Sequence, residues 1–200
     1  MLSIKPISIN EWMPDRCLST IEPIIPEKMD LRSGCPSLGK YTNGERGKLV
    51  SLYKNEIDEY GCCGFVAWKN ERVLGYISFF SLKTANRTRF YGYGEGNMND
   101  QLKDIFIHNC ISIWKRSSGK GIGTKLVNQV IKYGEEKKWN EYRVNNVLPD
   151  CEKGWGNHQK GCLSFWLKNG FTVTNEIEAE KEIQSYYHVR RKYTLSYIYE

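Results

Sequence analysis

The pattern of apolar and polar positions predicts strands and helices in alternation. Residues 2–9 alternate as in a half-buried strand, and apolar side chains recur at helical spacing from about 45 to 60. Two apolar runs, 62–68 and 73–82, flank the short polar sequence KNER and predict a β-hairpin. A third, long strand is predicted at 102–114.

The second half of the chain predicts one long amphipathic helix and shorter elements. The apolar face of that helix comprises Ile122, Leu126, Val127, Val130 and Ile131. A strand is predicted at 142–147, followed by a short helix that ends at Gly170. Strands at 171–173 and 186–199 follow, separated by the charged segment 175–185.

Two segments carry no periodic pattern. Residues 22–44 are rich in proline and glycine, and residues 84–100 are polar and glycine-rich, so both are expected to be irregular. We find no repeat and no convincing linker. The order of elements therefore predicts an α/β protein with a single domain over residues 1–200.

The composition changes this picture little. With 200 residues, 40% of them hydrophobic, the chain can bury a sizeable core. The formal charge of +6 is compatible with an anionic ligand such as a nucleotide and does not demand nucleic acid. The chain opens with no leader-like pattern and has no apolar run of membrane length, so we expect a cytoplasmic protein without a membrane partner.

The cysteines are expected to be reduced thiols. There are seven, an odd number at irregular spacing. His108 and Cys110 would share one strand face, and His158 and Cys162 one helix face, which raises the question of a metal site. Because the chain has no C-x-x-C element, no metal is expected.

The sequence ISIWKRSSGKGIGTKL, residues 111–126, combines glycines and lysines between a strand and a helix, an arrangement suited to phosphate binding. A Walker A loop does not fit, because Trp114 replaces its first glycine and Gly121 its hydroxyl residue. A dinucleotide-binding fingerprint fails as well, because Thr124 or Leu126 occupies its third glycine position.

This segment, followed by SFWLKNGF, resembles the core of the GNAT superfamily of acyl-CoA-dependent N-acyltransferases. The family pattern is Arg or Gln, two residues, Gly, any residue, then Gly or Ala. Gly121 and Gly123 match the glycine end, whereas Ser118 departs from the Arg/Gln position and Arg116 is the nearest substitute. The resemblance covers residues 62–175 well, and residues 1–60 would be the family-variable substrate side.

The resemblance implies a GNAT-like fold with a mixed, mostly antiparallel twisted sheet of about six to seven strands, flanked by helices and splayed between the fourth and fifth strands. It implies acetyl-CoA as co-substrate, with its diphosphate on backbone N–H groups at the start of the helix. The residues implied to bind it are Ile111, Ser112, Ile113, Ser118, Gly119, Lys120, Gly121, Ile122, Gly123, Thr124, Asn146, Asn157 and Trp166, with Asn145 and Gln159 as alternatives for the two amides.

The catalytic groups are less clearly marked. The resemblance implies that the Ile113 N–H faces the thioester carbonyl as an oxyanion donor. Ile107 stands where members of the family carry a carboxylate, so the adjacent His108 is our candidate general base, with Asp104 and Glu95 as runners-up.

The acid for the leaving thiolate is open. Trp166 stands where many members of the family place a tyrosine, and an indole cannot donate a proton in this way. The remaining candidates are Cys162, Ser164 and Tyr187.

The predicted function is transfer of an acetyl group from acetyl-CoA to a primary amine of a small molecule or peptide, by direct attack in a ternary complex. A run of glutamates between the last two strands would favour a cationic acceptor, or would form an ordinary solvated loop. Its members are Glu176, Glu178, Glu180 and Glu182. A homodimer is also expected.

Two alternatives stay open at this stage. A catalytically silent acyl-CoA-binding module would explain the departures from the family pattern. A nucleic-acid or protein-binding module would use the basic helix face, which comprises Lys125, Lys132, Lys137 and Lys138.

Overall fold

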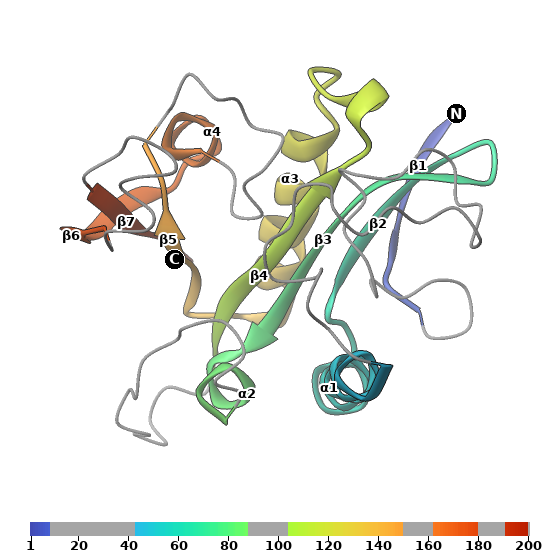
Figure 1. The fold of residues 1–200 in the computed structure, drawn as a ribbon, viewed down its shortest axis with the longest axis horizontal. Helices are drawn as coiled ribbons and strands as arrows, with labels where there is room; N and C mark the ends of the chain where they lie inside the picture. Colours follow the sequence, from blue (N-terminus) through green and yellow to red (C-terminus); the bar gives the residue numbers. More distant parts are fainter. Residues whose placement is uncertain (9–42, 88–103, 150–161, 180–190, 200) are drawn as a thin grey trace. The chain divides into compact units, whose positions relative to one another are not determined.

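The structure is a computed structural model that describes residues 1–8, 43–87, 104–149, 162–179 and 191–199 (Figure 1). In chain order its elements are β1 (Leu2–Pro6), α1 (Asn43–Tyr60), β2 (Gly64–Lys69), β3 (Arg72–Ser81), α2 (Leu82–Arg87), β4 (Ile105–Ile113), the 3₁₀ turn η3 (Lys115–Ser117), α3 (Ile122–Lys137), β5 (Glu141–Val147), α4 (Leu163–Lys168), β6 (Thr172–Glu178) and β7 (Arg191–Ile198).

The described strands form one seven-stranded sheet in the order β1-β2-β3-β4-β5-β7-β6. The pairs β1–β2, β2–β3, β5–β7 and β6–β7 are antiparallel, whereas β4 and β5 run parallel and are connected through α3. This mixed, mostly antiparallel sheet with flanking helices confirms the predicted fold class. No helix in the described ranges is long and apolar enough to cross a membrane.

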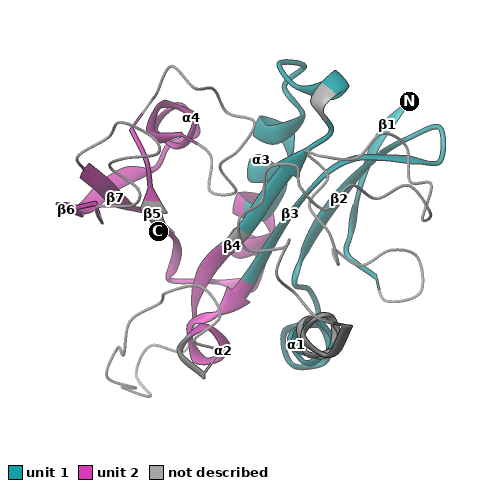
Figure 2. Cartoon of the chain, in the orientation of Figure 1, with its two compact units in different colours: residues 1–79, 110–130 teal, residues 80–109, 131–200 magenta. Residues whose placement is uncertain are grey.

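The chain divides into two compact units (Figure 2). Unit 1 comprises Met1–Phe79 and Cys110–Val130. Unit 2 comprises Phe80–Asn109 and Ile131–Glu200. Both β4 and α3 therefore contribute residues to each unit.

Unit 1 contains the predicted hairpin. Asn70 and Glu71 connect β2 to β3 with φ of 48° and 62°, the two positive values that a two-residue turn of type I′ requires. Helix α1 packs its Tyr53 into the interior, where the hydroxyl donates to Ser78 Oγ at 3.2 Å. The predicted helix and its stop at Gly61 are confirmed, with φ of 81° at that glycine.

Unit 2 has an aromatic core on one face of the sheet. Trp139 stacks on Phe106 of β4 with ring centroids 3.8 Å apart, and it also lies against Tyr142 of β5. Trp166 of α4 meets Phe171 edge to face at 4.9 Å. On the other face of β4, residues Ile105 and Ile107 pack with Leu82 and Ala85 of α2.

Two element predictions were wrong. The segment from residue 84 was expected to be irregular, yet Leu82–Arg87 forms α2, with the Thr84 N–H donating to Ser81 Oγ at 3.2 Å. Strand β6 was expected to end at residue 173 but continues to Glu178. Four of its seven residues are β-branched, which favours a strand, and the other three are polar, which suits exposure along its whole length.

The extended β6 corrects the placement of the glutamate run. Glu176 and Glu178 lie in β6, not in a loop between strands. Glu176 forms an ion pair with Arg191 of β7 at 2.6 Å, so part of the negative charge of the glutamate run is balanced within the sheet. Glu180 and Glu182 lie outside the described residues.

Candidate active site

The glycine segment between β4 and α3 takes a conformation that other residues resist. Gly119 and Gly121 have φ of 73° and 72°, in the left-handed region that costs a side chain about 1–2 kcal/mol. A Cβ added at either glycine would meet nothing within 4 Å. Both glycines therefore hold a conformation that favours glycine, and the space beside each Cα is open.

Helix α3 begins immediately after Gly121. The Lys125 N–H donates to the Gly121 carbonyl at 3.1 Å, which makes this the first turn of the helix. The N–H groups of Ile122, Gly123 and Thr124 precede that bond and have no acceptor within the helix. The first turn carries no acidic residue, so the positive end of the helix dipole is left for an external anion.

The end of β4 adjoins β3 closely. The Trp114 N–H donates to the Leu74 carbonyl at 2.8 Å. A Cβ added to Gly75 would lie 2.9 Å from the Ser112 carbonyl oxygen and 2.6 Å from Ile113 Cδ1. Gly75 thus allows this approach, which fixes the backbone of Ser112 and Ile113, two of the residues predicted to bind the acyl arm.

The ladder between β4 and β5 is short. Ile105, Phe106 and Ile107 pair with Glu141, Tyr142 and Arg143. No further β4–β5 pair is formed among the described residues, although β4 continues to Ile113 and β5 to Val147. The paired part of both strands therefore lies within unit 2.

His108, the candidate base, lies in the interior of unit 2. Its imidazole is fully buried, and Nδ1 lies 2.9 Å from the Tyr142 hydroxyl. The ring of Trp166 packs against it edge to face, with centroids 4.9 Å apart. Because the imidazole and the Tyr142 side chain are both fully buried, neither is exposed to an acceptor amine in this arrangement.

Tyr142 is the contact that sequence reasoning missed. It occupies the β5 position that pairs with Phe106, and its ring is fully buried. The sequence does contain a signal for its burial: Tyr142 and Val144 alternate with polar residues, and this pattern places both side chains on the same buried face of the sheet as His108. The partner itself depends on the register of β5 against β4, which the sequence does not specify.

Trp166 and Ile107 also lie away from solvent. The Trp166 indole is enclosed by Phe165, Phe171 and His108, so its position lends no support to the predicted contact with the co-substrate. Ile107 lies on the opposite face of β4 from His108 and packs beneath α2. The structure therefore has an apolar side chain at the position where the family carries a carboxylate.

The other predicted residues divide into two groups. Asp104 is exposed at the start of β4, Asn145 is half-buried in β5, and Cys162 is buried at the start of α4. The structure does not describe the side chain of Asn146. Four further predicted residues lie entirely outside the described ranges: Glu95, Asn157, Gln159 and Tyr187.

The sequence raised the question of a metal site and predicted none. Of the residues concerned, Cys110 Sγ lies 3.4 Å from the Tyr76 hydroxyl, Cys162 is the residue before α4, and His158 lies outside the described residues. Within the described ranges no three His, Cys, Asp or Glu side chains gather in a way that could hold a metal ion.

Comparison with known proteins gives a family for this arrangement. A sequence model of the acetyltransferase (GNAT) family matches residues 33–156, which contain the glycine segment and its helix. No curated protein sequence matches the chain.

Solved structures share the fold at low identity. An acetyltransferase of the GNAT family from Streptococcus pneumoniae has 12% identity and a TM-score of 0.61, with full coverage of both chains. A GNAT family acetyltransferase from Elizabethkingia anophelis, with acetyl-CoA bound, has 13% identity and a TM-score of 0.53, covering 99% of this chain and 98% of its own. Naa50 from Arabidopsis thaliana, in complex with the bisubstrate analogue CoA-Ac-MVNAL, has 17% identity and a TM-score of 0.54, covering 99% of each chain.

Proposed function

Because the chain belongs to the GNAT family of acetyltransferases, we propose that it transfers an acetyl group from acetyl-CoA to a primary amine of a small molecule or peptide. The transfer is a direct attack of the neutral amine on the thioester in a ternary complex. A bond forms between nitrogen and the acyl carbon, the carbon–sulfur bond breaks, and CoA leaves as thiolate.

The observation that carries the proposal is the open glycine corner before α3. Gly119 and Gly121 hold a left-handed backbone whose outer side is clear, and three N–H groups of the first helical turn follow. Such a corner suits the diphosphate of coenzyme A. The segment Ser118–Thr124 would bind that diphosphate, and the lysine at position 120 adds positive charge to it.

The acyl arm is assigned to the end of β4. Ile111, Ser112 and Ile113 would pair with the pantetheine amides as a neighbouring strand does, and the Ile113 N–H would stabilise the oxyanion. The contacts of this segment with β3 support the assignment, because the Trp114 N–H bond to Leu74 and the close approach to Gly75 hold its backbone in place. The amides of Asn146 and Asn157 keep their proposed role on the arm.

His108 keeps its proposed role as general base, now acting through Tyr142. In this proposal the Tyr142 hydroxyl, 2.9 Å from Nδ1, would be the first group of a proton relay from His108. The expected cytoplasmic location, homodimer and cationic acceptor belong to the same proposal. The pairing of Glu176 with Arg191 weakens the case for the cationic acceptor.

A catalytically silent acyl-CoA-binding protein is the second candidate. The apolar Ile107 and the buried Trp166, at positions where the family carries a carboxylate and a tyrosine, favour it.

The experiment combines binding with turnover. Isothermal titration measures acetyl-CoA affinity, and release of free thiol is followed across amino acids, peptides, polyamines and aminoglycosides. Acetyl-CoA binding with amine-dependent thiol release is the expected result. Binding without release for any amine would assign the silent candidate, and absence of binding would overturn both.

A further inference from the structure

The backbone of Ile111–Ile113 in β4 lies between two hydrogen bonds from or to β3. The residue directly before it is Cys110, whose Sγ accepts a hydrogen bond from the Tyr76 hydroxyl at 3.4 Å. The residue directly after it is Trp114, whose N–H donates to the Leu74 carbonyl at 2.8 Å. All of these residues belong to unit 1. The segment assigned to the acyl arm is therefore held at both ends by one short stretch of a neighbouring strand.

The two hydrogen bonds differ in kind. The bond from Trp114 joins two backbones, as bonds between neighbouring strands of any sequence do. The bond from Tyr76 joins two side chains, so it exists only because a hydroxyl and a sulfur stand at these two positions. The sheet does not require it, and a single substitution can remove it without changing the strands.

Tyr76 and Gly75 meet β4 on opposite faces of the sheet, because successive side chains of a strand alternate. On one face, a Cβ at position 75 would lie 2.6 Å from Ile113 Cδ1. On the other face, Tyr76 meets Cys110. Contacts on both faces restrict rotation of the segment about its own axis.

The Tyr76–Cys110 pair is buried. Tyr76 is 2% exposed and Cys110 is 6% exposed. Water therefore does not compete with this hydrogen bond as it would at the surface, and close packing limits the movement of both side chains. The pair is a fixed part of the interior of unit 1.

We propose that Tyr76 is a positioning residue for acetyl transfer, which acts through Cys110 to fix the backbone that ends at the Ile113 N–H. The inference rests on the proposed function, in which this N–H stabilises the oxyanion. An oxyanion donor is effective only if it is held in place before the charge develops. Loss of the Tyr76 hydroxyl should therefore slow the chemical step more than it weakens acetyl-CoA binding, because the diphosphate is proposed to bind at the glycine corner.

Three single substitutions test this role. Tyr76→Phe removes the hydroxyl and keeps the ring, and Cys110→Ala removes the acceptor. Tyr53→Phe is the matched control, because it removes another buried tyrosine hydroxyl of unit 1, which donates to Ser78 Oγ at 3.2 Å. Ser78 pairs with Gly64 of β2, so this bond connects α1 to the strand pair β2–β3 and includes no residue of β4.

Hydrogen exchange of the full chain measures the anchoring without any acceptor. The amides of residues 111–113 should exchange about threefold to tenfold faster in Tyr76→Phe than in wild type, the size expected for the loss of one neutral hydrogen bond. Tyr53→Phe loses a bond of the same kind, so a general loss of stability affects both variants. Exchange at residues 111–113 should therefore rise more in Tyr76→Phe than in Tyr53→Phe.

Steady-state kinetics measures the consequence for the reaction, with the amine of the panel that gives the fastest thiol release. The kcat should fall about threefold to tenfold in Tyr76→Phe and in Cys110→Ala. The double variant should fall no further, because both substitutions remove the same hydrogen bond. The Kd for acetyl-CoA should stay within about twofold of wild type, which separates positioning from binding. Tyr53→Phe should keep the wild-type kcat, because a loss of stability alone does not change turnover below the Tm.

Three results would overturn the inference. They are exchange at residues 111–113 that is the same in Tyr76→Phe and Tyr53→Phe, a wild-type kcat in Tyr76→Phe, and an equal fall of kcat in Tyr53→Phe. Wild-type protein that binds acetyl-CoA but releases no thiol with any amine would instead overturn the proposed function, and the exchange measurement would still decide whether Tyr76 anchors the segment.

Discussion

Substitution of Gly121 by alanine tests the coenzyme corner most sharply. Its φ of 72° costs a non-glycine residue about 1–2 kcal/mol, and the smaller entropy of the unfolded alanine chain returns about 0.4–1 kcal/mol. An added Cβ meets nothing within 4 Å, so no clash contributes. The net loss of stability is therefore about 1 kcal/mol, or a Tm lower by about 2–4 °C for a domain of this size.

The effect on binding should exceed the effect on folding. Relief of the strain moves the N–H groups at the start of α3, and the Cβ enters the open side of the backbone where the diphosphate is proposed to lie. Losing one hydrogen bond to a charged group costs about 1.5–3 kcal/mol, so acetyl-CoA affinity should fall by roughly tenfold or more. Titration calorimetry below the Tm of the variant measures it directly.

Gly170 provides a matched control. Its φ is 87°, and an added Cβ would lie 3.4 Å from the Tyr197 ring, an ordinary contact. Gly170→Ala should therefore lose about as much stability as Gly121→Ala while keeping wild-type acetyl-CoA affinity. The reasoning is refuted if Gly121→Ala binds acetyl-CoA as the wild type does, or if both variants lose affinity equally.

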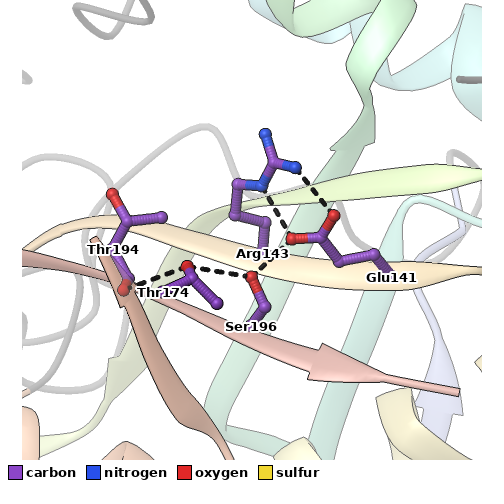
Figure 3. Close-up of polar contacts among 5 residues, drawn as sticks. All are labelled: Glu141, Arg143, Thr174, Thr194 and Ser196. Atoms are coloured by element: carbon purple, nitrogen blue, oxygen red, sulfur yellow. Dashed lines mark hydrogen bonds and ion pairs between the residues drawn. The ribbon is translucent and has the colours of Figure 1, made fainter.

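Four further substitutions, in three predictions, test other parts of the structure. Gly75→Ala should lower both the Tm and acetyl-CoA affinity, because its Cβ would lie 2.9 Å from the Ser112 carbonyl oxygen; thermal unfolding and titration check this, and an unchanged Tm would contradict the close approach. Glu141 accepts two hydrogen bonds from Arg143, at 2.8 and 2.7 Å, and a third from the Ser196 hydroxyl (Figure 3). Glu141→Gln should lower the free energy of unfolding by roughly 1–3 kcal/mol near pH 7. Because the pKa of the Glu141 carboxyl is lowered in the folded state, the difference in stability from wild type should shrink as the pH falls below the ordinary value of 4.5. Denaturant unfolding measures this difference, and a difference that does not change with pH would count against the prediction. His108→Gln and Tyr142→Phe should each remove the acidic limb of the kcat/KM profile if the pair relays the proton, and a limb that persists in both variants would take the pair out of the mechanism.

Periodicity was enough to predict most of the fold. The apolar face of α3 is buried at Ile122, Leu126, Val127 and Val130, because a 3.6-residue repeat of this kind can face only one side. The hairpin at Asn70 and Glu71 followed from two apolar runs with a short polar connection. The glycine segment stood out in the sequence as a phosphate-binding candidate, and the resemblance to the GNAT superfamily implied its role; the positive φ of Gly119 and Gly121 explains why glycine stands at both positions.

The errors arise where a neighbour decides the structure. The end of β6 is set by its pairing with β7, and nothing in the charged sequence after residue 173 reports that pairing. The polar group of Glu141, Arg143 and Ser196 was missed for the same reason. Ser196 comes 55 residues after Glu141 in the chain, and the two side chains meet only because β5 and β7 are neighbours in the sheet.

A crystal structure with acetyl-CoA tests the central claim most directly. We expect the diphosphate oxygens within hydrogen-bond distance of the N–H groups from Gly121 to Thr124, with the thioester along Ile111–Ile113. Acetyl-CoA bound at another part of the chain, with the glycine corner facing solvent, would contradict the account.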